Sequence, residues 1–279
     1  MKSIVYCICF VFCLSAIAHE EPAKTLYERN EKIAQKELYA SLGVKTVTVF
    51  SLHSEMHHSM FLTMGYAIDG TYEYLVSYKN DSLNLQVKYG YSKQGDMISD
   101  ADYNPEGKLI EKNIFRYDKQ GRVVSGKSYE SKKPSATFRF IHSSDKKTIE
   151  FHKINNKNQL EYKLIYSYLN DFDTEDYSSV VKLSADVSQQ MRVVKTYNQN
   201  GKVAEKIIYG ADDSLMHSFR YTYDDRGNNT EIERFNNKGE LVRLDVFDYN
   251  EKGLITEQYA TDKDGIIVSR LVYEYEFYG

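Results

Sequence analysis

The chain has 279 residues and a formal net charge of −4, with 42% hydrophobic and 14% aromatic residues. This faintly acidic balance argues against a broad basic surface for nucleic acid. Tyrosine is abundant at 25 residues, tryptophan is absent and proline occurs three times. The composition excludes a multi-span membrane protein, a disulfide-stapled miniprotein and a disordered proline-rich chain.

Residues 1–18 have the pattern of a secretory signal peptide. Lys2 precedes an apolar run that ends in the small-residue pattern Ala16-Ile17-Ala18. The alternative is a membrane anchor, but the run is shorter than the roughly 20 apolar residues that a spanning helix needs. We therefore expect cleavage after Ala18, a secreted or periplasmic address and no transmembrane span in the mature chain.

All three cysteines lie inside the expected leader, at Cys7, Cys9 and Cys13. The mature chain would then have neither a disulfide nor thiol chemistry. Cys13 could mark a lipoprotein, but Val11 and Phe12 before it are not the small residues that lipoprotein processing prefers.

Helical spacing of apolar residues predicts a helix over residues 22–42, with Gly43 at its C-terminal stop. We treat residues 19–43 as an N-terminal helical cap that covers an end of the structure. From residue 44 the pattern changes to β-branched residues at a period of two, which predicts strands. Residues 44–279 are expected to form one β domain.

A short unit recurs along this domain: an aromatic residue, then Asn, Asp or Ser, then two polar residues, then Gly. A type I turn favours Asn, Asp or Ser first, because their side chains accept hydrogen bonds from nearby backbone N–H groups. Glycine follows because the end of such a turn takes positive φ. The eight predicted structural-turn glycines are Gly95, Gly107, Gly121, Gly201, Gly227, Gly239, Gly253 and Gly265.

The spacing of these glycines alternates between 12 and 14 residues, a 26-residue period that contains two turns. Weaker turns continue the series on both sides, which predicts about seventeen strands. Strands joined by tight turns are antiparallel neighbours. The expected fold is therefore all-β: a long antiparallel meander of hairpin repeats in a curled or spiral sheet, with a short N-terminal helix.

Pairs of aromatic residues two positions apart precede many of the turns and should stack in columns on one face. Tyrosine suits sugar stacking and protein contacts, so these residues are the predicted binding surface, although packing of the inner face explains them more simply. They are Tyr89, Tyr91, Tyr117, Tyr166, Tyr168, Tyr221, Tyr223, Tyr249, Tyr273 and Tyr275.

The repeated unit resembles the YD (Rhs-type) repeat, Tyr-x-Tyr-Asp-x-x-Gly. Residues 221–227 match it in full, and residues 115–121 and 247–253 come close. The resemblance covers roughly residues 66–279. It implies a spiralling antiparallel sheet, often a hollow shell, in a short secreted bacterial repeat protein. Large members of the family carry toxins or adhesion modules, whereas we expect no toxin-like tail after the last strand of this chain.

Candidate chemistry is sparse. His53, His57 and His58 form the densest group of metal-ligand types, but a strand-turn-strand is expected there, and metal binding is the weaker interpretation. The acidic segment of residues 171–176 fails the EF-hand spacing. Asp118, Asp224 and Asp262 are interpreted as turn caps rather than catalytic acids. No cofactor motif is present in the sequence.

These observations favour a secreted, non-enzymatic β-repeat protein that acts as a binding or structural module for a protein or glycan partner at the cell envelope. A glycan-directed hydrolase with a carboxylate pair in a Tyr-lined concavity is the alternative. A metal-binding periplasmic module is a third hypothesis. No nucleic-acid partner is expected.

Overall fold

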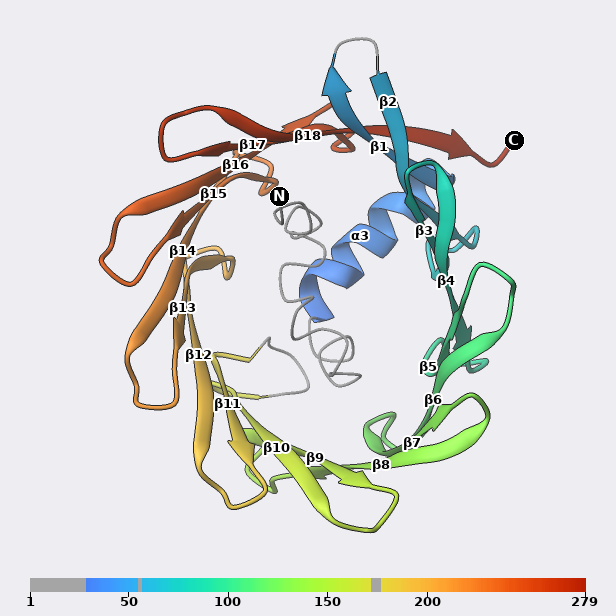
Figure 1. The fold of residues 1–279 in the computed structure, drawn as a ribbon, viewed down its shortest axis with the longest axis vertical. Coiled ribbons are helices and arrows are strands. Elements are labelled where there is room, and N and C mark those ends of the chain that lie inside the picture. The colour runs from blue at the N-terminus through green and yellow to red at the C-terminus, as the bar shows by residue number, and fades with distance from the viewer. Residues whose placement is uncertain (1–28, 55–56, 172–176) are drawn as a thin grey trace.

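The computed structural model describes residues 29–54, 57–171 and 177–279. The expected signal peptide of residues 1–18 and the start of the helical cap lie outside these residues. Within the described ranges, one helix, α3 (Arg29–Leu42), precedes a single antiparallel sheet of eighteen strands. Figure 1 shows the strands as a ring with α3 inside it.

The strands follow one another around the ring in chain order. Their bounds are β1 Val44–Ser54, β2 His57–Tyr66, β3 Tyr72–Lys79, β4 Ser82–Tyr91, β5 Met97–Tyr103, β6 Leu109–Tyr117, β7 Val123–Glu130, β8 Lys133–His142, β9 Thr148–Asn155, β10 Leu160–Ser167, β11 Ser179–Ser184, β12 Gln189–Tyr197, β13 Val203–Tyr209, β14 Leu215–Tyr223, β15 Asn229–Phe235, β16 Leu241–Tyr249, β17 Ile255–Asp262 and β18 Ile267–Phe277.

The sheet closes on itself, so the expectation of a curled or spiral open sheet is wrong. Strand β1 pairs with β18, the last strand, as well as with β2, and seven residue pairs from Val44↔Phe277 to Ser51↔Leu271 join the first and last strands. Closure removes both edge strands, whose unpaired backbone groups would otherwise invite aggregation. The all-β class and the antiparallel hairpins of the prediction are confirmed.

The position of α3 also differs from the expectation that it covers an end of the sheet. The ring of Tyr39 lies 4.7 Å from that of Tyr66 on β2 and 6.4 Å from that of Tyr275 on β18. Lys36 of the same helix forms an ion pair with Asp69 at 3.3 Å. The helix therefore lies against the inner side of the closure seam (Figure 1).

The turns have the geometry that the repeated unit favours. In the turn after β14, the Gly227 N–H donates to the Asp224 carbonyl at 2.9 Å, and Gly227 has φ of 83°. The Asp224 carboxylate accepts from the N–H groups of Arg226 and Asn228 at 3.0 and 2.7 Å. All eight predicted turn glycines have positive φ, and the equivalent positions without glycine are held by Asn158 and Asp213, also at positive φ.

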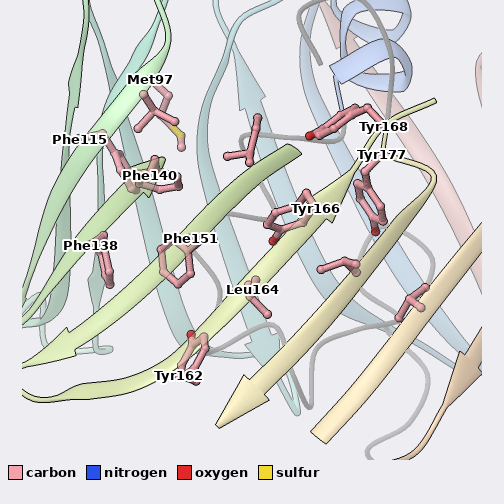
Figure 2. Close-up of a cluster of buried hydrophobic side chains, with 14 of the residues drawn as sticks. Met97, Phe115, Phe138, Phe140, Phe151, Tyr162, Leu164, Tyr166, Tyr168 and Tyr177 are labelled. Atoms are coloured by element: carbon pink, nitrogen blue, oxygen red, sulfur yellow. The ribbon is translucent and has the colours of Figure 1, made fainter. Parts of the chain in front are cut away.

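The largest hydrophobic cluster follows the wall from β5 to β12. Phe138, Phe151, Leu164 and Tyr166 are each almost wholly buried and come from three consecutive strands. Figure 2 shows these side chains on one side of the strands. A second cluster joins α3 to β1–β3 and β18, and a smaller one centres on Phe219. Among the described residues, these apolar clusters thus follow the wall of the ring.

Candidate functional site on the inner wall

Residues that face the inside of the ring can be followed from strand to strand through the pairing register. Val47 of β1 pairs with Met64 of β2 and with Tyr275 of β18, and Tyr39 of α3 packs in the same cluster. Directly paired residues of neighbouring strands point to the same face. We call the face that continues from Val47 the inner wall.

The structure places all ten predicted binding-surface tyrosines on the inner wall, where most take part in packing. Tyr166 and Tyr168 are buried in the largest cluster, with Tyr89, Tyr91 and Tyr117 packed against it. Tyr221 and Tyr249 pack around Phe219, while Tyr273 and Tyr275 join the α3 cluster. Burial raises the pKa of Tyr91 to about 12, so its hydroxyl stays neutral at physiological pH.

The aromatic residues that precede the turns at the other end of the barrel point to the outer face instead. Tyr103, Tyr209 and Phe235 lie on the outer face, each with a cation over its ring: Lys88 at 5.5 Å, Arg192 at 4.2 Å and Arg220 at 4.8 Å respectively. The two aromatic sets of the 26-residue period therefore line opposite faces.

The inner wall of β5–β7 carries a group of carboxylates that we call the acidic arc: Asp100, Asp102, Glu111 and Glu130. Asp102, Glu111 and Glu130 are direct cross-strand neighbours. The Asn113 side-chain amide lies between two of these groups and donates to Asp100 at 2.8 Å and to Glu111 at 3.4 Å.

The carboxyl group of Asp100 has a pKa well above its ordinary value. Burial raises its pKa to about 7, and the neighbouring charges of Asp102 and Glu111 act in the same direction, while the bond from Asn113 opposes them. A carboxyl group of this pKa is present in both protonation states near neutral pH, which is the property of a general acid or base.

The inner wall of β12–β16 carries the opposite charge, and we call it the basic arc: Lys195, Lys206, His217, Arg234 and Arg243. Four of its members belong to one continuous row, in which Lys195 pairs with Lys206, Lys206 with Phe219, Phe219 with Arg234, and Arg234 with Arg243. Figure 1 places β5–β7 and β13–β16 on opposite sides of the ring.

The Arg243 end of this row is neutralised locally. Its guanidinium makes two bonds to the Asp245 carboxylate, at 2.8 and 2.7 Å, and Asp245 is 1% exposed. Such paired bonds are the strong geometry for an arginine and a carboxylate. The remaining members of the basic arc lie on β12–β15, whose inward positions hold no carboxylate.

The other candidates of the sequence analysis fall elsewhere. The backbones of His53, His57 and His58 belong to β1 and β2, and the side chains of these histidines lie outside what the structure describes. Elsewhere, the described residues contain no group of three or more side chains suited to a metal ion. Residues 172–176 of the acidic segment lie outside the described part of the chain. Asp118 and Asp262 accept backbone N–H groups within their turns, as Asp224 does.

The described helix is too short and too polar to cross a bilayer.

Comparisons with known proteins find low similarity. No protein-family model and no curated protein matches the chain. Among solved structures, a porin-like protein from Bacteroides uniformis aligns with TM-score 0.44 and 10% identity, over 84% of this chain and 98% of the other. A porin-like protein from Bacteroides vulgatus aligns with TM-score 0.35 and 12% identity, over 84% and 99%. The Photorhabdus luminescens Tc holotoxin pore aligns with TM-score 0.21 and 9% identity, over 76% and 15%.

Proposed function

We propose that this chain is a secreted, non-enzymatic binding protein that holds a glycan partner on the inner wall of its barrel. The observation that carries the proposal is the segregation of inward-facing charge into the acidic and basic arcs. Packing does not require these groups, because like charges directly opposite one another destabilise a sheet. Their placement on the inner wall supports a ligand as their purpose.

The size of the ring favours a glycan over a protein as that partner. Strands about 4.8 Å apart and tilted by about 40° make an eighteen-strand ring roughly 35 Å across. A helix is about 10 Å thick, and α3 lies within this ring. A folded domain of 100 residues has a radius of gyration of about 13 Å and is too wide for the remaining width, whereas a sugar chain is thin.

The outer wall favours a location in water, either at the cell envelope or outside the cell. Outward-facing charged residues occur within the strands rather than only at their ends, including Lys112, Lys127, Arg220 and Asp248. A lipid-facing wall would carry an apolar band, and a charge at its middle would cost about 2–4 kcal/mol. With the leader expected over residues 1–18, this favours a secreted or periplasmic protein.

The acidic arc supports a second candidate function, a glycan-directed hydrolase. Asp100, with its raised pKa, has the property of the proton donor, and Glu111, linked to it through Asn113, would be the second carboxylate. Tyr89 is the direct cross-strand neighbour of Asp100 and would supply an aromatic face.

One experiment separates the two functions. Binding of neutral and acidic oligosaccharides is followed by tyrosine fluorescence, which no tryptophan obscures in this chain, while reducing-end release is assayed in the same mixtures. Binding without turnover is the expected result. Turnover that Asp100→Asn abolishes would instead establish the hydrolase. Absence of binding to every oligosaccharide would contradict the binding function.

A further inference from the structure

Two like-charged pairs flank an aromatic ring in the central row of the basic arc. Lys195 is directly opposite Lys206, and Arg234 is directly opposite Arg243, with Phe219 between the two pairs. The Lys206 ammonium lies 4.5 Å from the centre of the Phe219 ring, and the Arg234 guanidinium lies 5.8 Å from it. The ring thus holds cations of both pairs at one place on the inner wall.

This arrangement concentrates positive charge on a partly buried stretch of the inner wall. Lys195 and Arg234 are half-buried, and removing a cation from water is costly unless an opposite charge compensates it. Asp245 compensates Arg243. The inward positions of β12–β15 supply no carboxylate for Lys195 or Arg234. Lys195 and Arg234 are therefore complementary to negative charge that strands β12–β15 do not provide.

A buried donor beside Phe219 points to the same conclusion. An Arg234 terminal nitrogen donates to His217 Nε2 at 3.1 Å. Burial, and then the Arg234 charge, lowers the pKa of His217, and a hydrogen bond to the Phe235 backbone opposes this shift. Arg234 Nε is buried without a hydrogen-bond partner among the described residues. Buried donors are normally satisfied, so this nitrogen is suited to an acceptor from a ligand.

We propose that the basic arc binds an anionic group, a carboxylate, sulfate or phosphate, carried on a sugar chain. Guanidinium groups favour oxyanions with two or more oxygens, and an aromatic ring beside them suits the face of a sugar. The inference rests on the proposed glycan-binding function and specifies its ligand class as acidic.

The test compares removal of charge from the inner wall with removal of charge from the outer wall in the same part of the barrel, β12–β15. Affinities of the purified protein are measured by calorimetry for a uronic-acid oligosaccharide, a sulfated oligosaccharide, a neutral oligosaccharide of equal length, and inorganic sulfate and phosphate. The inner variants are Lys195→Gln and Arg234→Gln. The matched outer control is Arg220→Gln, because Arg220 is exposed and stacks on Phe235 at the outer face of β14. Thermal melting checks that each variant is folded.

The expected result is that the acidic oligosaccharides bind, that each inner variant weakens them by about tenfold, and that the outer control and the neutral oligosaccharide show no such loss. The attraction should also weaken as salt is raised. Preference between the uronic and sulfated probes identifies the anionic group, and binding of the inorganic ions alone would retain the anion site but reject the sugar.

Two results overturn the inference, and they differ from each other. Equal affinity for neutral and acidic oligosaccharides, unchanged in the inner variants, would reject the anionic ligand while the glycan-binding function stands. No binding of any probe would reject both. If an inner variant fails to fold, the charge-keeping variants Lys195→Arg and Arg234→Lys are used instead. The deciding measurement is then the salt dependence of affinity: the preference for acidic over neutral oligosaccharides should be lost as salt is raised, and a preference that salt does not change would overturn the inference.

Discussion

The Tyr117 hydroxyl donates to the Met97 carbonyl oxygen at 2.7 Å, from β6 to the start of β5, twenty residues earlier. The same bond, at the same separation, joins Tyr197 to Tyr177, Tyr223 to Val203, Tyr249 to Asn229 and Tyr275 to Ile255, at 2.7–2.8 Å. At each site the tyrosine lies near the end of one strand and satisfies a carbonyl at or near the start of the preceding strand. The second tyrosine of the repeated unit is thus a brace between successive repeats.

His142 takes this place in a repeat that lacks the tyrosine. Its Nε2 lies 2.7 Å from the Val123 carbonyl oxygen, and Ser143, which follows it, accepts the Thr148 N–H at 2.9 Å in the place of the usual Asp or Asn. A neutral imidazole donates one hydrogen bond, as a phenol does. This degenerate repeat therefore keeps the bracing contact with a different residue.

Removing the brace should destabilise the barrel. Tyr117→Phe deletes the hydroxyl and leaves the Met97 carbonyl without its donor, so we expect a loss of about 1–2 kcal/mol in the free energy of unfolding. Urea unfolding followed by circular dichroism measures it. Tyr209→Phe on the outer face is the control and should change stability by less than about 0.5 kcal/mol. Equal effects of the two substitutions would contradict the bracing role.

A turn glycine should resist a β-branched residue but accept asparagine. Gly227 has φ of 83°, so Gly227→Val should cost about 1–3 kcal/mol. Gly227→Asn should cost less, because asparagine tolerates this region, as Asn158 does at its own turn. Melting temperatures of the two variants give the comparison, and an unchanged value for the valine variant would argue against the turn geometry.

Closure of the ring can be tested by cross-linking its first and last strands. Thr48 and Glu274 are directly opposite each other on the outer face. Directly opposite residues of antiparallel strands have Cα atoms about 4.5–5.5 Å apart, which a disulfide can span. The double variant Thr48→Cys with Glu274→Cys should form an intramolecular disulfide on mild oxidation, detected by mass spectrometry. Glu274→Cys with Thr137→Cys, on β8, should not form one. An open sheet would leave both pairs reduced.

Asp100 should make stability depend on pH. Its pKa is raised in the folded chain to about 7, so between pH 4 and pH 7 the folded state binds more protons than the unfolded state. The free energy of unfolding should therefore fall as pH rises through this window, by on the order of 2–4 kcal/mol, and then level off.

Asp100→Asn should remove that slope and be more stable than the parent chain at pH 8, because the amide has no charge to desolvate. Denaturant unfolding from pH 4 to pH 8 gives the comparison, and Asp248→Asn, at an exposed outer position, is the control. Parallel pH profiles for Asp100→Asn and the parent chain would show that Asp100 is not the group responsible.

The local chemistry of the repeat could be predicted from the sequence because it depends on neighbours along the chain. The Asp224 carboxylate bonds to N–H groups two and four residues away, and Gly227 takes positive φ at the end of the same turn. The regular spacing of the turns predicted antiparallel hairpins for the same reason. The helix that ends before Gly43 was also predicted, from the helical spacing of its apolar residues.

Only the tertiary structure decided that the sheet closes, where α3 lies and which charges face inwards. Closure depends on pairing between Val49 and Tyr273, which are 224 positions apart, and no local pattern specifies such a contact. The register shift near each turn, as between Thr196 and Tyr197, changes which residues share a face. As a consequence, Lys195 and Lys206 are directly opposite each other on the inner wall. Counting alternate residues along the sequence would not place them on the same face. Turn chemistry is a property of a few adjacent residues, whereas the shape of the ring and its charged arcs follow from the accumulated twist, register and pairing of all eighteen strands.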